Sequence, residues 1–323
     1  MFSVPDTVRQ AAKSGPLFVV LNAASGHKDT DAERQVLADV FTSAGRAFEF
    51  LQFDDPASIA RVSAKAVASA KAKGGVVVAA GGDGTINAVA AAVLRSGCPF
   101  GVLPQGTFNY FGRTHAIPQD ARAAACALLG ASVSPVTVGQ VNGRVFLVNA
   151  SLGLYPQLLE DREAWKQQFG RSRMVAFASG LVTLLKARGQ LKLDIELAGQ
   201  TSALRTPTLF IGNNYLQLSQ VGIDEAHAQA VNRGALTGIA VRPIGTLALL
   251  GLLARGVIGR LGDADNINSF SFRKLKVTMR GKRLVKVATD GEITWMTPPL
   301  IFEVADTPLL LMVPAAADRA AVA

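Results

Sequence analysis

The stretch Val76-Val-Val-Ala-Ala-Gly-Gly-Asp-Gly-Thr-Ile-Asn87 decides the fold, because its pattern changes from strand to helix across a glycine turn. Residues 76–80 are small or β-branched, which predicts a strand buried on both faces. From Thr85 onward the apolar residues follow helical spacing. Such a turn favours an anion, since free N–H groups and the helix dipole both point at it. Asp83 is itself negative, so we expect its carboxylate to hold a cation or take up a proton.

The composition bounds the class of protein. A chain of 323 residues predicts two domains with a sizeable core. With 33 basic and 24 acidic residues, the net charge of +9 suits a nucleotide, a membrane surface or nucleic acid as partner. Cys98 and Cys126 lack metal-binding spacing, and residues 1–13 lack the apolar run of a signal peptide, so we expect a reduced, cytoplasmic protein. Arginines interrupt residues 244–261, which leaves too short an apolar run for a membrane span.

The rhythm of the pattern divides the chain. Strands alternate with helices over residues 14–134, which predicts an α/β domain with a mostly parallel sheet. Short strands dominate residues 135–314, which predicts a second, mainly antiparallel β domain, a sandwich or partial barrel. Residues 305–314 are assigned to this second domain as its last strand. Residues 315–323 are expected to form a disordered tail.

Three polar turns follow predicted strands of the first domain. They are Asn22-Ala-Ala-Ser-Gly26, Gly81-Gly-Asp-Gly-Thr85 and Leu103-Pro-Gln-Gly-Thr-Phe-Asn-Tyr-Phe-Gly-Arg113. We expect them at the carboxyl edge of the sheet, where parallel sheets bind ligands. Glycines allow close backbone approach there, and Asn, Ser and Thr can bond phosphate oxygens. The plainer alternative is a set of tight connections, with Thr107 as a helix N-cap.

These turns resemble the nucleotide-binding motifs of the diacylglycerol kinase catalytic domain, which is shared with sphingosine kinases and, more distantly, NAD kinases. The third turn is similar to the family's Leu-Pro-x-Gly-Thr-x-Asn segment, and the first to its Asn-Pro-x-Ser/Ala-Gly loop, with Ala23 at the proline position. The resemblance implies that the chain binds ATP and Mg²⁺, with Asp83 as the metal-holding and catalytic carboxylate. The residues it implies for nucleotide binding are Asn22, Ser25, Gly26, Gly81, Gly82, Asp83, Gly84, Thr85, Asn87, Gly106, Thr107 and Asn109.

A fourth motif, Asp290-Gly-Glu292, lies at a predicted strand end in the second domain. Two residues apart on a strand, its carboxylates would project to one side. It matches the family's Asp-Gly-Glu, which implies that Glu292 takes the proton of the acceptor hydroxyl and that Asp290 orients this hydroxyl. An isolated Asp-Gly would instead indicate a β-turn with solvated acids.

Some residues depart from the family pattern. Ala88 replaces a common glutamate, and Tyr110 replaces a common aspartate. Residues 232–238 lack the acids with which many bacterial members hold a structural magnesium, so we expect that metal site to be absent. Two classes of function therefore stay open. One is a lipid kinase acting on diacylglycerol, a sphingoid base or another lipid alcohol. The other is a nucleotide- or lipid-binding pseudokinase, with an NAD kinase as a further alternative.

Basic residues gather in two groups, within residues 162–192 and 273–286. Few aromatic residues are interleaved, so nucleic acid is not expected as a partner. We expect a lipid substrate and peripheral contact with the anionic cytoplasmic face of the inner membrane. The basic hairpin at 273–286 and the apolar face of a helix at 244–261 would provide this contact. The alternatives are a solvated hairpin face and a core helix. The sequence leaves open whether the chain forms a homodimer.

Overall fold

The computed structural model describes residues 3–23, 27–106, 109–153, 156, 190–220, 222–242, 266–279 and 281–320. The chain divides into two compact units, the first formed by Met1–Val138 with Asp306–Ala323 and the second by Gly139–Ala305. Among the helices of the described residues, none is long and apolar enough to cross a membrane. The helix expected at 244–261 lies outside the described residues.

The first unit is built on a mixed sheet in which the described strands have the order β2-β1-β3-β4-β18-β5. Their bounds are β1 Leu17–Asn22, β2 Phe48–Phe53, β3 Val76–Gly81, β4 Phe100–Pro104, β5 Ser132–Val136 and β18 Leu309–Val313. β2, β1, β3, β4 and β18 run parallel, and β5 runs antiparallel to β18. β3 is buried at every position, as its small and β-branched residues predicted.

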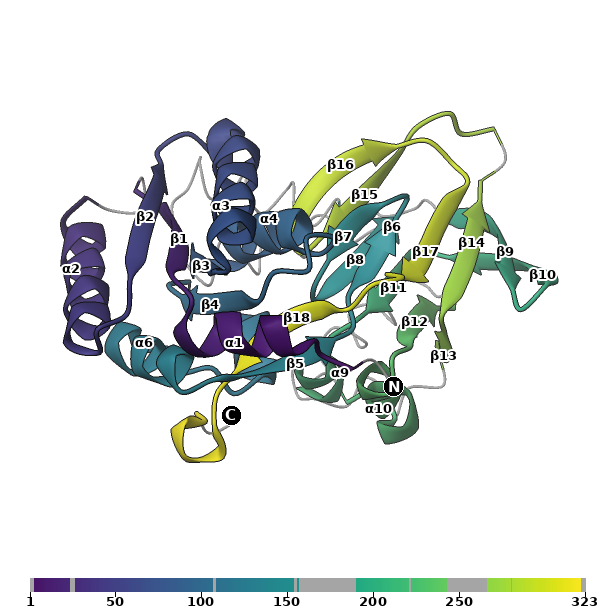
Figure 1. Cartoon of the computed structure of the whole chain (residues 1–323). Helices are drawn as coiled ribbons and strands as arrows, with labels where there is room; N and C mark the ends of the chain where they lie inside the picture. The colour runs from purple at the N-terminus through teal and green to yellow at the C-terminus, as the bar shows by residue number, and fades with distance from the viewer. Residues whose placement is uncertain are drawn as a thin grey trace. The chain divides into compact units, whose positions relative to one another are not determined.

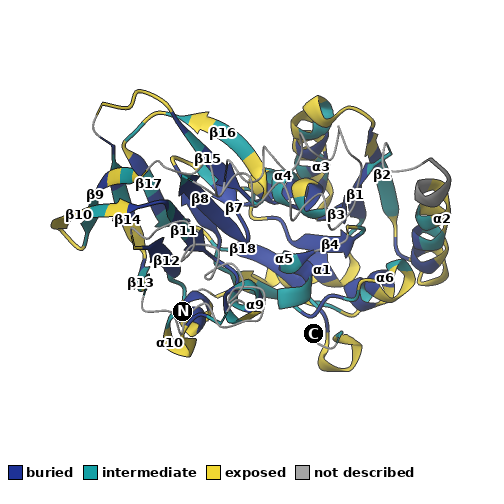
Figure 2. Ribbon diagram, turned by 180° about the vertical axis from the view of Figure 1, so that it is seen from behind, coloured by how far each residue is buried: buried dark blue, intermediate teal, exposed yellow. Residues whose placement is uncertain are grey.

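Helices cover both faces of this sheet. Their bounds are α1 Asp6–Ser14, α2 His27–Ser43, α3 Ile59–Lys73, α4 Asp83–Val93, α5 Tyr110–Thr114 and α6 Ala121–Leu129, with short 3-10 turns at Pro56–Ser58 and Ala316–Asp318. Figure 1 shows α2 and α6 on one face of the sheet and α3 and α4 on the other. Phe41 of α2 and Leu128 of α6 pack on Val78 of β3 in one apolar cluster. The strands are largely buried, whereas the outer sides of these helices are exposed (Figure 2).

The last strand corrects the expected domain division. Residues 305–314 were assigned to the second domain, but β18 lies in the first sheet, between β4 and β5. The physical reason is its continuous apolar run, Leu309-Leu-Leu-Met312, whose residues are all buried. Such a run suits a strand covered on both faces rather than the alternating strand of a sandwich. The expected disordered tail is also wrong up to residue 320, because the Ala320 N–H donates to the Ala116 carbonyl at 2.9 Å.

The described strands of the second unit form two antiparallel sheets, with the orders β10-β9-β14-β17-β6-β7 and β13-β12-β11-β8-β15-β16. The strand bounds are β6 Gly139–Val141, β7 Arg144–Phe146, β8 Asn149–Gly153, β9 Leu191–Leu197, β10 Gln200–Thr206, β11 Thr208–Gly212, β12 Leu236–Val241, β13 Ile267–Phe272, β14 Lys274–Thr278, β15 Val285–Thr289, β16 Glu292–Met296 and β17 Leu300–Val304. Helices α9 Tyr215–Gln220 and α10 Glu225–Asn232 accompany them. Leu152 and Val287 of one sheet share a core with Leu275 and Phe302 of the other, which makes the unit a sandwich.

Two stretches of the chain each cross from one sheet of the second unit to the other. Residues 144–149 form β7 and the start of β8, and residues 270–279 form part of β13 and all of β14. The basic stretch 273–286 is therefore not a hairpin. β14 pairs with β9 and β17, whereas β15 pairs with β8 and β16 in the other sheet.

Candidate functional site

The glycine turn of the first unit places Asp83 at a helix start. β3 ends at Gly81 and α4 begins at Asp83, two residues earlier than the apolar pattern predicted. The carboxylate therefore lies in the first turn, where the helix dipole favours negative charge. Gly81 is required for space, because a Cβ there would come within 2.7 Å of the Thr85 side chain.

The second and third polar turns meet at the carboxyl edge of β3 and β4. A Cβ on Gly106 would lie 3.0 Å from the Cα of Gly82, so the two backbones approach each other closely. Asp83 Oδ2 accepts the backbone N–H of Asn109 at 3.1 Å. Two turns that are distant in sequence are thus fastened together by the aspartate of one of them.

Asn109 shapes the third turn. Its backbone is left-handed, with φ of 45°, and the residue is only 1% exposed. Its Oδ1 accepts the Gly106 N–H at 3.2 Å, and its Nδ2 donates to Gln119 Oε1 at 2.8 Å. The side chain that the resemblance assigned to nucleotide contact is therefore occupied in closing the turn. Gln119 was missed because it lies in a connection with no motif around it.

Two buried polar groups beside these turns point to a polar ligand. Asp83 Oδ1 and both amide atoms of Gln105 are buried, and no hydrogen-bond partner is found for them in the described part of the chain. Burial raises the pKa of Asp83, whereas the backbone N–H groups of Asn109 and Tyr110 oppose that rise. Buried groups without partners are rare in proteins and call for an explanation such as an ion or a ligand. Gln105 was not singled out from the sequence, because the family motif leaves its position variable.

The donor set around Asp83 fits a magnesium ion that arrives with a nucleotide. Across the described residues, no group of three His, Cys, Asp or Glu side chains could hold a metal alone. Mg²⁺ is often bound by one or two carboxylates together with substrate phosphates. One free carboxylate oxygen beside two glycine turns meets that requirement.

The other expected nucleotide-binding residues are only partly described. Asn22 ends β1, which lies beside β3 with Leu21 opposite Ala80, so it falls at the same sheet edge. Thr85 is buried in α4, Gly84 is exposed there, and Asn87 is partly buried. Ser25, Gly26 and Thr107 lie outside the described residues.

The Asp290 side chain connects two turns of the second unit. Its carboxylate accepts the backbone N–H groups of Leu147 at 2.7 Å and of Val148 and Asn149 at 2.9 Å. The Asp290 backbone N–H donates in turn to the Asn149 carbonyl at 2.9 Å. The carboxylate thus fastens the β15–β16 turn to the β7–β8 connection, and its expected role in orienting the acceptor hydroxyl stays a prediction. Asp290 is thus a positioning residue.

Glu292 is accessible and held by one arginine. Its side chain is 63% exposed, and its Oε2 lies 2.8 Å from Arg144 Nη2. Arg144 also donates from Nε to Thr289 Oγ1 at 3.0 Å, which fixes the guanidinium against β15. Arg144 was missed because it lies 148 residues from Glu292 in the sequence and belongs to no motif.

The turn between α10 and β12 is closed by protein groups. The Arg273 Nη1 donates to the Gly234 carbonyl at 2.6 Å, and Arg233 Nη2 donates to the Ala226 carbonyl at 3.2 Å. Residues 232–238 are the stretch that we expect to lack a structural magnesium site. The Arg273 guanidinium contacts this stretch at Gly234.

Comparisons with known proteins agree with this arrangement. Residues 16–141 match the family described as the diacylglycerol kinase catalytic domain. A diacylglycerol kinase of Staphylococcus aureus is 30% identical over 217 residues, which cover 62% of this chain and 67% of that protein. An uncharacterized protein of Synechocystis is 25% identical over 234 residues, and the match spans 69% of this chain but only 51% of that relative. A crystal structure of a diacylglycerol kinase from Bacillus anthracis shares the fold, with a TM-score of 0.67, 17% identity and coverage of 94% of this chain and 98% of that one. The chain belongs to the diacylglycerol kinase catalytic-domain family.

Proposed function

We propose that the protein is a lipid kinase that transfers the γ-phosphoryl group of Mg-ATP to a hydroxyl of a membrane-derived lipid, diacylglycerol or a sphingoid-base-like alcohol. The observation that carries this proposal is the Asp83 carboxylate, which joins two glycine turns and keeps one buried oxygen without a partner among the described residues. Phosphoryl transfer depends mainly on positioning of the reactants and on neutralisation of charge. The glycine turns after β3 and β4 would provide the positioning, and a metal held by Asp83 would provide the neutralising charge.

The nucleotide end of the reaction belongs to the first unit. The turns at Gly81, Gly82 and Gly106 let backbone N–H groups approach phosphate oxygens without a Cβ between them. Asp83 would hold the metal through its buried oxygen Oδ1, while Oδ2 keeps the two turns together. Magnesium, when bound, supplies neutralising charge for the phosphates.

The acceptor end belongs to Glu292. Its exposed carboxylate accepts the proton of the attacking hydroxyl, a role that needs access and a fixed position. Arg144 provides that position through its contact with Oε2. Asp290 supports both residues indirectly, because it holds the β7–β8 connection against the turn that precedes Glu292.

The acceptor also sets the place of the reaction. A lipid with acyl chains leaves a bilayer at a cost of about 0.8 kcal/mol per exposed CH₂ group. The kinase therefore works as a peripheral protein at the cytoplasmic face of the inner membrane, where ATP and the lipid meet.

The test is incubation of the full chain with γ-labelled ATP, Mg²⁺ and a panel of lipid alcohols in mixed micelles, with NAD as a control acceptor. We expect label in the lipid phase with diacylglycerol or a sphingoid base, and none in NAD. Glu292→Gln should abolish this transfer, whereas Glu303→Gln, which alters a carboxylate paired with Lys274 in the same unit, should not.

Two results would overturn the proposal. Tight ATP binding without transfer to any lipid would identify a pseudokinase, to which Ala88 and Tyr110 already give some support. Transfer to NAD alone would identify an NAD kinase.

A further inference from the structure

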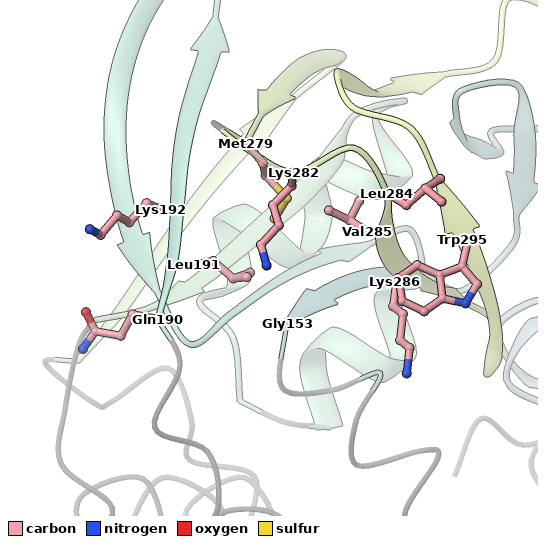
Figure 3. Close-up of a pocket in the computed structure, with 10 residues that line it drawn as sticks. All are labelled: Gly153, Gln190, Leu191, Lys192, Met279, Lys282, Leu284, Val285, Lys286 and Trp295. Carbon is pink, nitrogen blue, oxygen red and sulfur yellow. The ribbon is translucent and has the colours of Figure 1, made fainter.

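The second unit carries an apolar pocket with a basic border. The pocket has a volume of about 420 Å³, within the range of small-molecule sites. Its apolar wall consists of Leu191 of β9, Val285 of β15, and Met279, which follows β14. Met279 and Val285 are buried. Figure 3 shows these residues beside Lys282 and Lys286, whose side chains extend in the same direction.

Two large apolar side chains at this pocket are exposed to solvent. Trp295 of β16 is 58% exposed and Leu284 is 53% exposed. Among the described residues, these two are the exposed large hydrophobic side chains of the protein, and both line this one pocket. Exposed apolar groups gathered at one place mark a contact surface, and tryptophan is enriched where proteins meet the membrane–water interface.

The charge around the pocket is of one sign. Lys192, Lys282 and Lys286 line it, and no acidic residue does so in the described part of the chain. The Lys286 Nζ lies 5.1 Å from the centre of the Trp295 ring. Lys286 on β15 pairs directly with Trp295 on β16. The Lys286 ammonium group and the Trp295 indole thus lie side by side. A ligand with an anionic head and an apolar tail could contact both.

Two of the pocket lysines, Lys192 and Lys282, differ from the lysines of β14. Lys274 pairs with Glu303 at 3.0 Å, and Lys276 pairs with Glu196 at 2.9 Å. By contrast, Lys192 and Lys282 have no carboxylate partner within the residues that the structure describes. Within the described residues, the carboxylates of Glu303 and Glu196 therefore pair with the lysines of β14 and not with Lys192 or Lys282.

The pocket and the candidate base share one hairpin. Lys286 stands opposite Trp295 near one end of the β15–β16 pair, and Thr289 stands opposite Glu292 at the other. Three residues at a rise of about 3.3 Å each separate these positions by roughly 10 Å along the strand. Trp295 and Glu292 lie three residues apart on β16, so their side chains project from opposite faces of the hairpin. Docking at the pocket would bring the hairpin that carries Glu292 to the bilayer, which extends the proposed function on which this step rests.

We propose that this pocket docks the protein onto an anionic bilayer, with Trp295 and Leu284 entering the interface and Lys192, Lys282 and Lys286 contacting phospholipid phosphates. The ligand is an anionic phospholipid of the membrane surface. The lysines of the pocket suit its negative head group, and the exposed apolar side chains suit its acyl chains.

The first test uses Trp295 as its own reporter. The sequence holds two tryptophans, so Trp165→Phe in the full chain leaves Trp295 as the single indole. With phosphatidylglycerol vesicles its emission should shift to the blue and be quenched by brominated acyl chains. Phosphatidylcholine vesicles should cause neither change. Should Trp165→Phe not fold, sedimentation of the wild type and of Trp295→Ser with the same vesicles answers the same question.

The second test separates the pocket from net charge. Lys282→Glu should weaken sedimentation with phosphatidylglycerol vesicles by at least about fivefold, since a basic residue near the headgroups contributes about that factor. Lys65→Glu changes the net charge equally at an exposed position of α3 and should have less than about a twofold effect. Wild-type binding should also weaken as salt rises, because screening reduces the attraction between the lysines and the phosphates.

Several results would overturn the docking proposal. They are equal binding to neutral and anionic vesicles, a Trp295 emission that vesicles leave unchanged, and a Lys282→Glu variant that matches Lys65→Glu. These measurements need neither ATP nor acceptor, so a failure of the kinase proposal would not affect them. Activity of the wild type on a water-soluble short-chain diacylglycerol tests the kinase proposal separately.

Discussion

At the scale of single residues, the two aspartates of the motifs have different surroundings. Asp83 accepts the Asn109 N–H through Oδ2 and keeps Oδ1 buried without a partner among the described residues. Asp290 has its carboxylate surrounded by three backbone N–H groups. The first is equipped to bind a ligand, and the second is equipped to hold the chain in place.

We therefore expect Asp83→Asn to remove catalysis while the fold remains. The amide keeps the size of the side chain and an acceptor for the Asn109 N–H, but it lacks the charge that a metal beside phosphates requires. Turnover measured with labelled ATP should fall below about a tenth of the wild-type rate, a loss of more than ~1.4 kcal/mol of transition-state stabilisation. A variant that keeps more activity than this would show that Asp83 is not catalytic.

The Asp-Gly-Glu motif should separate stability from activity. Asp290→Ala leaves three backbone N–H groups without an acceptor, so urea unfolding should show a loss of about 3 kcal/mol or more. Glu292→Gln breaks an exposed ion pair and should cost less than about 1 kcal/mol, yet remove turnover. The assignment of roles would be reversed if Asp290→Ala folded as stably as the wild type.

At the scale of elements, turns and connections are fixed by contacts across the sandwich. The turn after α10 receives the Arg273 guanidinium, which comes from the junction of β13 and β14. The β7–β8 connection receives Asp290 from the β15–β16 turn. These two connections are thus stabilised by polar side chains from other connections, which satisfy backbone groups that no strand pairs.

The turn after α10 gives a prediction about metal. ATP turnover should require Mg²⁺, whereas a chelator should change the melting temperature by less than about 2 °C, a change in the free energy of unfolding of about 1 kcal/mol or less for a unit of 150–250 residues. Arg273→Ala should lower stability by about 1 kcal/mol, because the Gly234 carbonyl loses a charged donor.

Arg283→Ala removes a nearby exposed guanidinium and serves as the control, with an expected change within about 0.5 kcal/mol. A large fall in melting temperature on chelation would instead reveal a structural metal at this turn or elsewhere in the fold.

At the scale of the whole molecule, the chain returns to its first unit after completing the second. β18 pairs with β4 on one side and β5 on the other, so the first sheet is incomplete until residue 313 is in place. Leu309 and Leu311 of this strand are 1% and 0% exposed. The nucleotide turns thus depend on a strand about 200 residues further along the chain.

Removal of residues 306–323 should therefore prevent ATP binding, although every candidate nucleotide residue precedes residue 110. The deletion exposes the inner edges of β4 and β5 and removes the buried side chains of β18 from the core. Circular dichroism and ATP-dependent protection from proteolysis would show the loss. The milder Leu311→Ala should cost about 2–5 kcal/mol. ATP binding by the truncated chain with wild-type affinity would contradict this dependence.

The sequence by itself determined what is local in this protein. The buried run at β3, the glycine turns, and the alternation of strand and helix are properties of neighbouring residues, and they predicted the α/β unit, its ligand-binding edge and the β-rich second unit. Local pattern also located Asp83 and the Asp290-Gly-Glu292 motif, although the roles of their side chains followed from family resemblance.

Only the tertiary structure decided which residues hold these motifs. The partner of Glu292 is Arg144, and the acceptors and donors around Asp290 lie more than 140 residues away. The membership of β18 in the first sheet depends on which strands flank it, because its apolar run indicates a strand covered on both faces but does not specify the neighbouring strands. Periodicity reports burial and secondary structure within one segment, whereas these pairings arise when segments far apart in the chain pack together, and no short stretch of sequence encodes them.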